Sequence, residues 1–253
     1  MPDETMENAG NDRFPETRRS VIEAARSIDA EERGRAMESL CAAYWRPVYK
    51  YIRLRWNRPV EDAQDLTQGF FIALIERDLL AKYYPSKSRL RTYLRMCVDS
   101  FVLNEHKAAG RLKRGGNFPH VALDFEAAEE ELGSRTIDPA AIPSPESLED
   151  FFEKEWVRSL FTLAVEELRK LCEEKERTRS FSLFEAYDLS ENKDISYEQL
   201  AQEYGISASD VTNALAWARK EFRSIALERL REISGSNEEF QREAQAVFGW
   251  EIK

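Results

Sequence analysis

Two aspartates three residues apart, Asp62 and Asp65, have the side-chain type and the spacing for a defined chemical task. Residues three apart lie on one face of an α-helix, so the two carboxylates could together receive the planar fork of an arginine. Glu61 and Gln68 extend the same polar face. Apolar residues recur at helical spacing on the opposite face, at Val60, Ala63, Leu66, Phe70 and Leu74. The segment 60–76 therefore predicts an amphipathic helix whose acidic face either binds a basic partner or is simply solvated.

A second set of candidate side chains combines positive charge with aromatic rings, the two features that bind a nucleic acid strand. The cations that we select for phosphate contact are Lys82, Lys87, Arg89, Arg91 and Arg95. Tyr83, Tyr84 and Tyr93 lie among them. Tyr93 also belongs to the apolar stripe of a helix predicted from residue 89 onward, so packing in the core is the alternative role for its ring.

Residues 196–223 have the pattern of a helix-turn-helix. Ser196 and Gln199 form a capping box that opens the first helix, Gly205 supplies the turn, and Ser207 caps the second helix. In such a unit the second helix enters the major groove of DNA, where an asparagine can read adenine through two hydrogen bonds. The candidate contact residues of this unit are Ser207, Ser209, Thr212, Asn213, Trp217, Lys220 and Arg223.

Catalysis is not indicated by any motif in the sequence. The two histidines, His106 and His120, have no metal-ligand spacing to each other or to the cysteines. Cys41, Cys97 and Cys172 lie far apart among apolar neighbours, which favours reduced thiols in the core. The sequence has neither a glycine-rich phosphate loop nor a nucleophile elbow. We therefore expect no enzymatic activity, no cofactor and no bound metal.

Three segments, in this order, resemble the extracytoplasmic-function class of bacterial RNA polymerase sigma factors. The family's polymerase-docking motif is similar to EDAQDLTQGFF, which begins at Glu61. The start of its promoter-melting helix is similar to SRLRTYL, from Ser88 to Leu94. Its carboxy-terminal helix-turn-helix is similar to the segment from Ser196 to Arg223. The resemblance implies a protein that binds core RNA polymerase and promoter DNA and directs transcription initiation.

The resemblance also implies a role for each group of candidate residues. Asp62 and Asp65, with Glu61 and Gln68 beside them, would contact basic residues on the clamp helices of the polymerase's largest subunit. The five cations selected above would hold the backbone of the minus-ten element. The helix-turn-helix residues would contact the minus-thirty-five element.

Thr67 is a candidate modification site that the resemblance adds. A subgroup of these sigma factors is thought to depend on Ser/Thr kinases, and a phosphate on Thr67 would add nearly two negative charges. A helical wheel places Thr67 at the edge of the apolar side, so a packed threonine is the alternative. A Ser/Thr kinase and an anti-sigma protein are the regulatory partners that the resemblance adds.

Charge is unevenly distributed along the chain, whose net charge is −10. Cations gather at 46–58 and 82–114, and acids gather at 124–131 and 146–155. One surface could therefore meet a polynucleotide and another a basic protein. No apolar run approaches the roughly 20 residues of a membrane span, and the acidic amino terminus lacks the pattern of a signal peptide, so we expect a cytoplasmic protein.

An all-α fold with two helical domains is the architecture that these patterns predict. The expected parts are a disordered tail at 1–15, a sigma region 2-like bundle at 16–112, an acidic linker at 113–147, a region 4-like helix-turn-helix domain at 148–233 and an extension at 234–253. The alternative function, from a different class, is a helical protein-interaction or adaptor protein that retains a degenerate helix-turn-helix. A stand-alone repressor is a third hypothesis.

Overall fold

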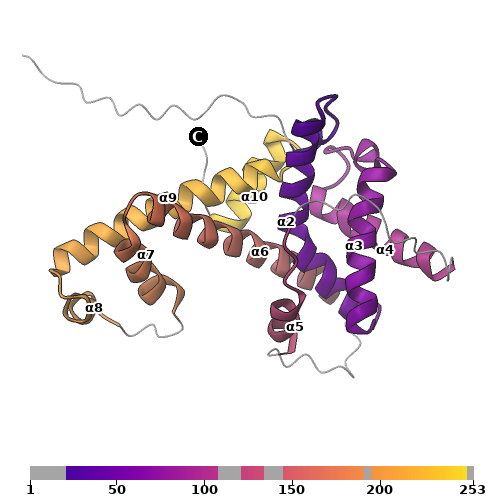
Figure 1. Ribbon diagram of the computed structural model, residues 1–253. Helices are drawn as coiled ribbons and strands as arrows, with labels where there is room; N and C mark the ends of the chain where they lie inside the picture. The colour runs from indigo at the N-terminus through magenta and orange to yellow at the C-terminus, as the bar shows by residue number, and fades with distance from the viewer. Residues whose placement is uncertain (1–20, 108–120, 134–144, 191–194, 250–253) are drawn as a thin grey trace, which may run out of the picture.

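The computed structural model describes residues 21–107, 121–133, 145–190 and 195–249, and these residues form helices and no strand (Figure 1). The α-helices are α1 (Val21–Ala25), α2 (Ala30–Arg55), α3 (Val60–Glu76), α4 (Leu90–Lys107), α5 (Phe125–Gly133), α6 (Pro145–Glu174), α7 (Thr178–Phe184), α8 (Tyr197–Tyr204), α9 (Ala208–Glu232) and α10 (Asn237–Phe248). Two short turns of other helical types are η1 (Leu79–Lys82) and η2 (Glu185–Leu189). The predicted all-α class is confirmed for the described residues, and the predicted tail at 1–15 lies outside them.

Local capping explains where the helices of the helix-turn-helix begin. Ser196 and Gln199 form the predicted capping box at the start of α8, and Ser207 forms a second capping box with Asp210 at the start of α9. Gly205 ends α8 in the left-handed region, with a φ of 63°, which a residue without a Cβ adopts at little cost. Both helices therefore start where the sequence predicts.

Pro47 lies inside α2 and does not divide it. A proline removes one backbone hydrogen bond and crowds the preceding turn, which favours a kink or a break in a helix. The helix instead continues as one element of 26 residues, and both Pro47 and the following Val48 are buried. Packing on both sides of the proline offsets the lost hydrogen bond.

Buried side chains form two hydrophobic cores. The first core joins α1 to α5 with the amino-terminal half of α6, the end of α9 and α10. The second core joins the carboxy-terminal half of α6 with α7, α8 and most of α9. The helix-turn-helix thus belongs to the second core, and the acidic helix α3 belongs to the first.

Two long helices, α6 and α9, contribute to both cores. In α6, Phe152 and Trp156 lie in the first core, whereas Leu168 lies in the second. In α9, Leu215 lies in the second core and Leu230 in the first. The second helix of the helix-turn-helix was expected to end near residue 223, but it extends to Glu232 and reaches the first core. The two cores are therefore connected by packed helices as well as by the chain.

The predicted linker and the predicted extension both contain a packed helix. Helix α5 lies within 113–147, and its Phe125 packs edge-on against Trp45 of α2, with ring centroids 5.4 Å apart. Helix α10 lies within 234–253 and folds back beside α9, so that its Phe240 is buried in the first core. Each helix brings acidic side chains to the surface of the first core, with consequences for the candidate site.

Candidate functional site

The acidic face of α3 is exposed as the sequence predicts. Glu61, Asp62, Asp65 and Gln68 all have exposed side chains, whereas the apolar residues between them are buried. The early position of Glu61 and Asp62 also suits the positive end of the helix dipole. The four predicted polymerase-binding residues therefore share one accessible face.

Thr67 lies on the buried side of the same helix. Its side chain is 0% exposed, and its hydroxyl donates a hydrogen bond to the carbonyl oxygen of Ala63 at 2.7 Å. The structure thus has the packed threonine that the helical wheel suggested as the alternative. A kinase could reach this hydroxyl only after α3 had opened locally.

Two of the five cations selected for phosphate contact are exposed on the turn before α4. Lys82 ends η1, and Lys87 lies with its ammonium 5.1 Å from the ring centroid of Tyr84, which is also exposed. Tyr93 by contrast packs against Tyr83 and donates a hydrogen bond to the carbonyl oxygen of Leu79 at 2.6 Å. The ring of Tyr93 therefore has the packing role and not the stacking role.

The other three selected cations face acidic side chains from the second half of the chain. Arg91 is only 5% exposed; its guanidinium forms an ion pair with Glu243 of α10 and lies 4.8 Å from the ring centroid of Trp156. Arg95 contacts Glu149 of α6 at 2.9 Å. In this conformation Arg91 cannot contact DNA, because its guanidinium is buried and paired. Sequence reasoning could not show this pairing, since Glu243 lies 152 residues away along the chain.

Glu239 and Glu243 of α10 are functional candidates that sequence reasoning missed. Both are 3% exposed, although glutamate is rarely buried without a partner. The carboxylate of Glu239 accepts hydrogen bonds from the backbone N–H of Leu90 at 2.6 Å and from the hydroxyl of Tyr83 at 2.9 Å. Glu243 also lies 3.4 Å from the guanidinium of Arg89. The available signal was their spacing of four, which places both on the face of α10 that carries Phe240.

The cations of α2 are paired in the same way. Lys50 is 1% exposed, and its ammonium contacts Glu131 of α5 at 2.5 Å and Glu155 of α6 at 2.8 Å. Arg53 donates a hydrogen bond from Nε to Glu129 at 2.6 Å. Because that hydrogen bond favours the charged carboxylate, the pKa of Glu129 lies below its usual value. Glutamates of α5 and α6 therefore neutralise these two cations of α2.

The helix-turn-helix presents most of its predicted contact residues to solvent. The exposed ones are Ser207, Ser209, Thr212, Asn213, Lys220 and Arg223. Trp217 is only partly exposed, because the guanidinium of Arg177 lies 4.6 Å from its ring centroid. The hydroxyl of Thr212 donates a hydrogen bond to the carbonyl oxygen of Ala208 at 2.9 Å. Asn213, the next residue, presents an exposed side-chain amide near the start of α9.

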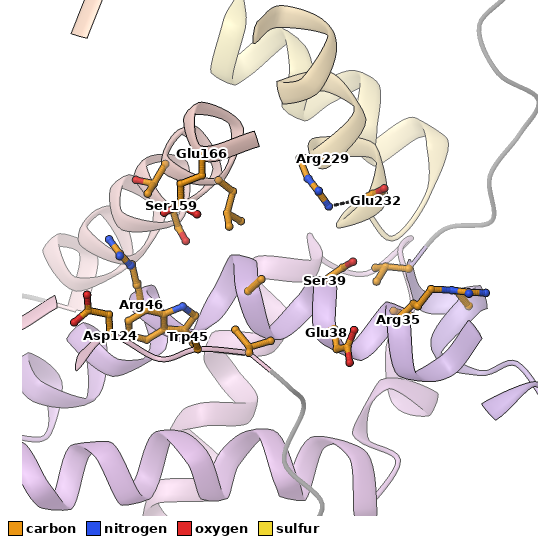
Figure 2. Close-up of a pocket in the computed structure, with 18 of the residues that line it drawn as sticks. Arg35, Glu38, Ser39, Trp45, Arg46, Asp124, Ser159, Glu166, Arg229 and Glu232 are labelled. Atoms are coloured by element: carbon orange, nitrogen blue, oxygen red, sulfur yellow. Dashed lines mark hydrogen bonds and ion pairs between the residues drawn. The ribbon is translucent and has the colours of Figure 1, made fainter. Parts of the chain in front are cut away.

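The groove shown in Figure 2 contains none of these predicted site residues. It has a volume of about 1180 Å³ and lies between α1, α2, α6, α9 and the segment before α5. Its arginines, Arg35, Arg46 and Arg229, each form an ion pair with a carboxylate of the chain. Figure 2 shows one of these pairs, Arg229 with Glu232. The groove therefore has a mixed charge and no set of free cations.

The cysteines of the chain are free thiols, and Cys97 is partly buried. Cys41 and Cys172 are buried free thiols, and burial raises the pKa of Cys41 to about 12. Among the residues that the structure describes, no cluster of three histidine, cysteine or acidic side chains could hold a metal ion. Within the same part of the chain, no helix combines the length and the apolar character of a membrane span.

Comparisons with protein-family models, with curated proteins and with solved structures found no match for this chain.

Proposed function

We propose that this chain is a sigma factor that binds core RNA polymerase and directs promoter-specific transcription initiation. The observation that carries the proposal is the helix-turn-helix of α8 and α9. Its two helices begin with capping boxes, and Ser209, Thr212 and Asn213 are exposed on the first turns of the second helix. In helix-turn-helix proteins these turns enter the major groove, so the exposed side chains occupy the position for base contacts.

The acidic face of α3 supports the polymerase-binding part of the proposal. Asp62 and Asp65 are both exposed and lie three residues apart on one helix. Their carboxylates are therefore placed to form charge-assisted hydrogen bonds with arginines of a partner protein. Apolar packing beneath them fixes the helix, because Phe70 and Leu74 on its inner face are fully buried or nearly so.

Lys82, Lys87 and Tyr84 support a contact with single-stranded DNA near α4. They combine exposed positive charge with an exposed ring beside the start of that helix. A strand separated from its complement needs both features, since cations hold its phosphates and a ring stacks on its bases. This group would meet the minus-ten element while α9 meets the upstream element.

The pairing of Arg91 and Arg95 favours a second candidate, a helical adaptor protein with a degenerate helix-turn-helix. Cations engaged within the chain do not bind DNA in this conformation, whereas the acidic face of α3 remains free for a protein partner. The two candidates differ in one activity, because only a sigma factor lets core polymerase start transcription at a promoter.

A reconstituted transcription assay decides between the candidates. Core polymerase and genomic DNA fragments from the source organism, mixed with the purified chain, should yield transcripts with defined starts. Core polymerase without the chain should not. The variant Asp62→Ala/Asp65→Ala should lower the yield of those transcripts, and Glu76→Ala, at the far end of the same helix, serves as the matched control. If the chain binds core polymerase but no defined transcript appears, the sigma-factor proposal is overturned and the adaptor candidate takes its place.

Phosphorylation of Thr67 remains part of this proposal as a regulatory hypothesis. Because its hydroxyl is buried and bonded to Ala63, modification would require the first turns of α3 to open. A phosphate there would also be incompatible with the packed position, since a doubly charged group cannot be buried without partners.

A further inference from the structure

Helix α10 covers the start of α4, which the proposed function assigns to promoter DNA. The hydrogen-bond donors at that start are the backbone N–H of Leu90, the hydroxyl of Tyr83 and the guanidinium groups of Arg89 and Arg91. All four face carboxylates of α10. Glu239 takes the first two donors, and Glu243 takes the two arginines.

This set of donors is one that binds phosphate groups. The first N–H groups of a helix have no partner within the helix and lie at the positive end of its dipole, so they attract anions. Arginines add charge-assisted hydrogen bonds of fixed geometry, which carboxylates and phosphates satisfy equally well. The two glutamates of α10 therefore occupy the positions that two phosphates of a DNA strand would occupy.

The burial of these contacts shows that the carboxylates of α10 and a DNA strand cannot bind the same donors at the same time. Glu239 and Glu243 are each only 3% exposed, and Phe240 between them is 2% exposed in the first core. A strand could reach Arg91 only after α10 had moved away. The carboxylates and the strand therefore compete for the same donors.

We propose that α10 is an internal competitor of DNA, which holds the minus-ten surface closed until it is displaced. The inference rests on the proposed function for the identity of the ligand, single-stranded DNA. It adds to that function a regulation that resides in the chain itself. Release of α10 would free Arg89 and the start of α4, and it would leave Arg91 with one carboxylate of α6, that of Glu153 at 3.4 Å. These groups would then join Lys82 and Lys87, which are already exposed.

Gly235 offers a way to displace α10 without removing a charge. A Cβ at this position would lie 2.5 Å from a ring carbon of Tyr83 and 2.8 Å from a carboxylate oxygen of Glu239, so the substitution Gly235→Ala forces the contact apart. The variant Glu239→Gln/Glu243→Gln tests the same contact by neutralising it. Glu238→Gln is the matched control, because Glu238 lies on α10 with an exposed side chain.

Binding of a labelled single-stranded DNA of about 16 nucleotides to the full chain, followed by fluorescence anisotropy, tests the inference. We expect Gly235→Ala and the double glutamine variant to bind at least about tenfold more tightly than the wild type, and Glu238→Gln to bind like the wild type. Adding Arg91→Ala to Gly235→Ala should cancel most of the gain. Two newly available phosphate contacts should also steepen the slope of log K against log salt by about 1.4.

Hydrogen exchange of the Leu90 amide provides an independent readout, because this N–H donates to Glu239. It should exchange faster in Gly235→Ala, while circular dichroism shows that the helices remain. Wild-type affinity for DNA in both Gly235→Ala and Glu239→Gln/Glu243→Gln would overturn the inference. The binding assay contains no polymerase, so tighter DNA binding without any transcription initiation would remove the sigma-factor proposal and leave the internal competition standing.

Discussion

The ammonium of Lys50 lies 2.8 Å from a carboxylate oxygen of Glu155, and both side chains are almost completely buried. Lys50 belongs to α2 and Glu155 to α6, so this ion pair joins the first helices of the chain to a helix of its second half. Glu131 of α5 contacts the same ammonium. Three segments far apart in the sequence thus meet at one buried cation.

Replacing Lys50 by methionine should destabilise the chain by about 2 kcal/mol, because the buried carboxylate of Glu155 would lose the ammonium at 2.8 Å, although it would keep the exposed guanidinium of Arg158 at 2.5 Å. Urea unfolding followed by circular dichroism measures the change. The double variant Lys50→Met/Glu155→Leu should recover most of the loss, since an apolar pair needs no compensation. Lys154→Met, at an exposed neighbouring position, should change stability by less than about 0.5 kcal/mol. A double variant as unstable as the single one would contradict this account.

The acidic face of α3 predicts a loss of polymerase binding on neutralisation. Asp62→Ala and Asp65→Ala should each weaken binding to core polymerase by about tenfold, or about 1.4 kcal/mol, because an arginine of the partner would lose its carboxylate. Surface plasmon resonance with immobilised core polymerase measures the effect. Equal affinities for these variants and for Glu76→Ala would show that the face is only solvated.

Thr67 predicts a contrast between an apolar and a charged replacement. Thr67→Val should keep the free energy of unfolding within about 1 kcal/mol of the wild type, because valine fills nearly the same space. Thr67→Glu should cost several kcal/mol, since it buries a charge at a fully enclosed position. Thermal unfolding compares the two. A stable Thr67→Glu variant would mean that this side of α3 opens easily, which would favour the kinase hypothesis.

Asn213 and Lys220 should have different effects on binding to double-stranded promoter DNA. Asn213→Ala should relax the preference for one base pair and cost about 1–3 kcal/mol at that position, as expected for a base contact. Lys220→Ala should weaken binding to all sequences alike and reduce the salt slope by about 0.9, as expected for a phosphate contact. Anisotropy titrations at several salt concentrations separate the two outcomes. An unchanged base preference in Asn213→Ala would exclude Asn213 as a reader.

The contact between α5 and α2 predicts a dependence of stability on pH. The hydrogen bond from Arg53 holds the pKa of Glu129 below the 4.5 of an unperturbed glutamate. A lowered pKa in the folded state contributes stability above the unfolded pKa, and the contribution is lost as the pH falls through the folded value. The stability difference between wild type and Glu129→Gln should therefore be largest above about pH 5 and should vanish in stronger acid. Urea unfolding at several pH values measures it, and Glu130→Gln, which alters an exposed neighbour, should show no such trend.

Local signals in the sequence were sufficient for much of the fold. The start of α8 at Ser196 and the start of α9 at Ser207 depend on side chains within three residues of each cap, so they could be read without knowledge of the rest of the chain. The acidic face of α3 likewise follows from periodicity alone. These features are local, and the structure has them where they were predicted.

Long-range pairing could not be read from the sequence in the same way. Arg91 was selected for DNA because its charge and neighbours fit a phosphate contact, but its charge is taken up by Glu243. Glu243 stood in an apparently peripheral extension. The expected domain division at 113–147 has the same difficulty, since Phe125 and Phe152 pack against Trp45 and Tyr51 of α2, which are distant in the sequence. The partner of a charged side chain and the core that a helix joins both depend on tertiary contacts, which the helix propensity of the residues does not determine.

The continuity of α9 has a mechanical consequence. At about 1.5 Å per residue, its 25 residues make a rod of about 37 Å, with the exposed first turns of the helix at one end and the short connection to α10 at the other. A tilt imposed on one end must move the other, because a helix of this length bends little. If the first turns of α9 bind an upstream promoter element as proposed, their movement would be transmitted to α10 and would weaken the ion pair of Glu243 with Arg91. Binding to one promoter element would then expose the surface that binds the next.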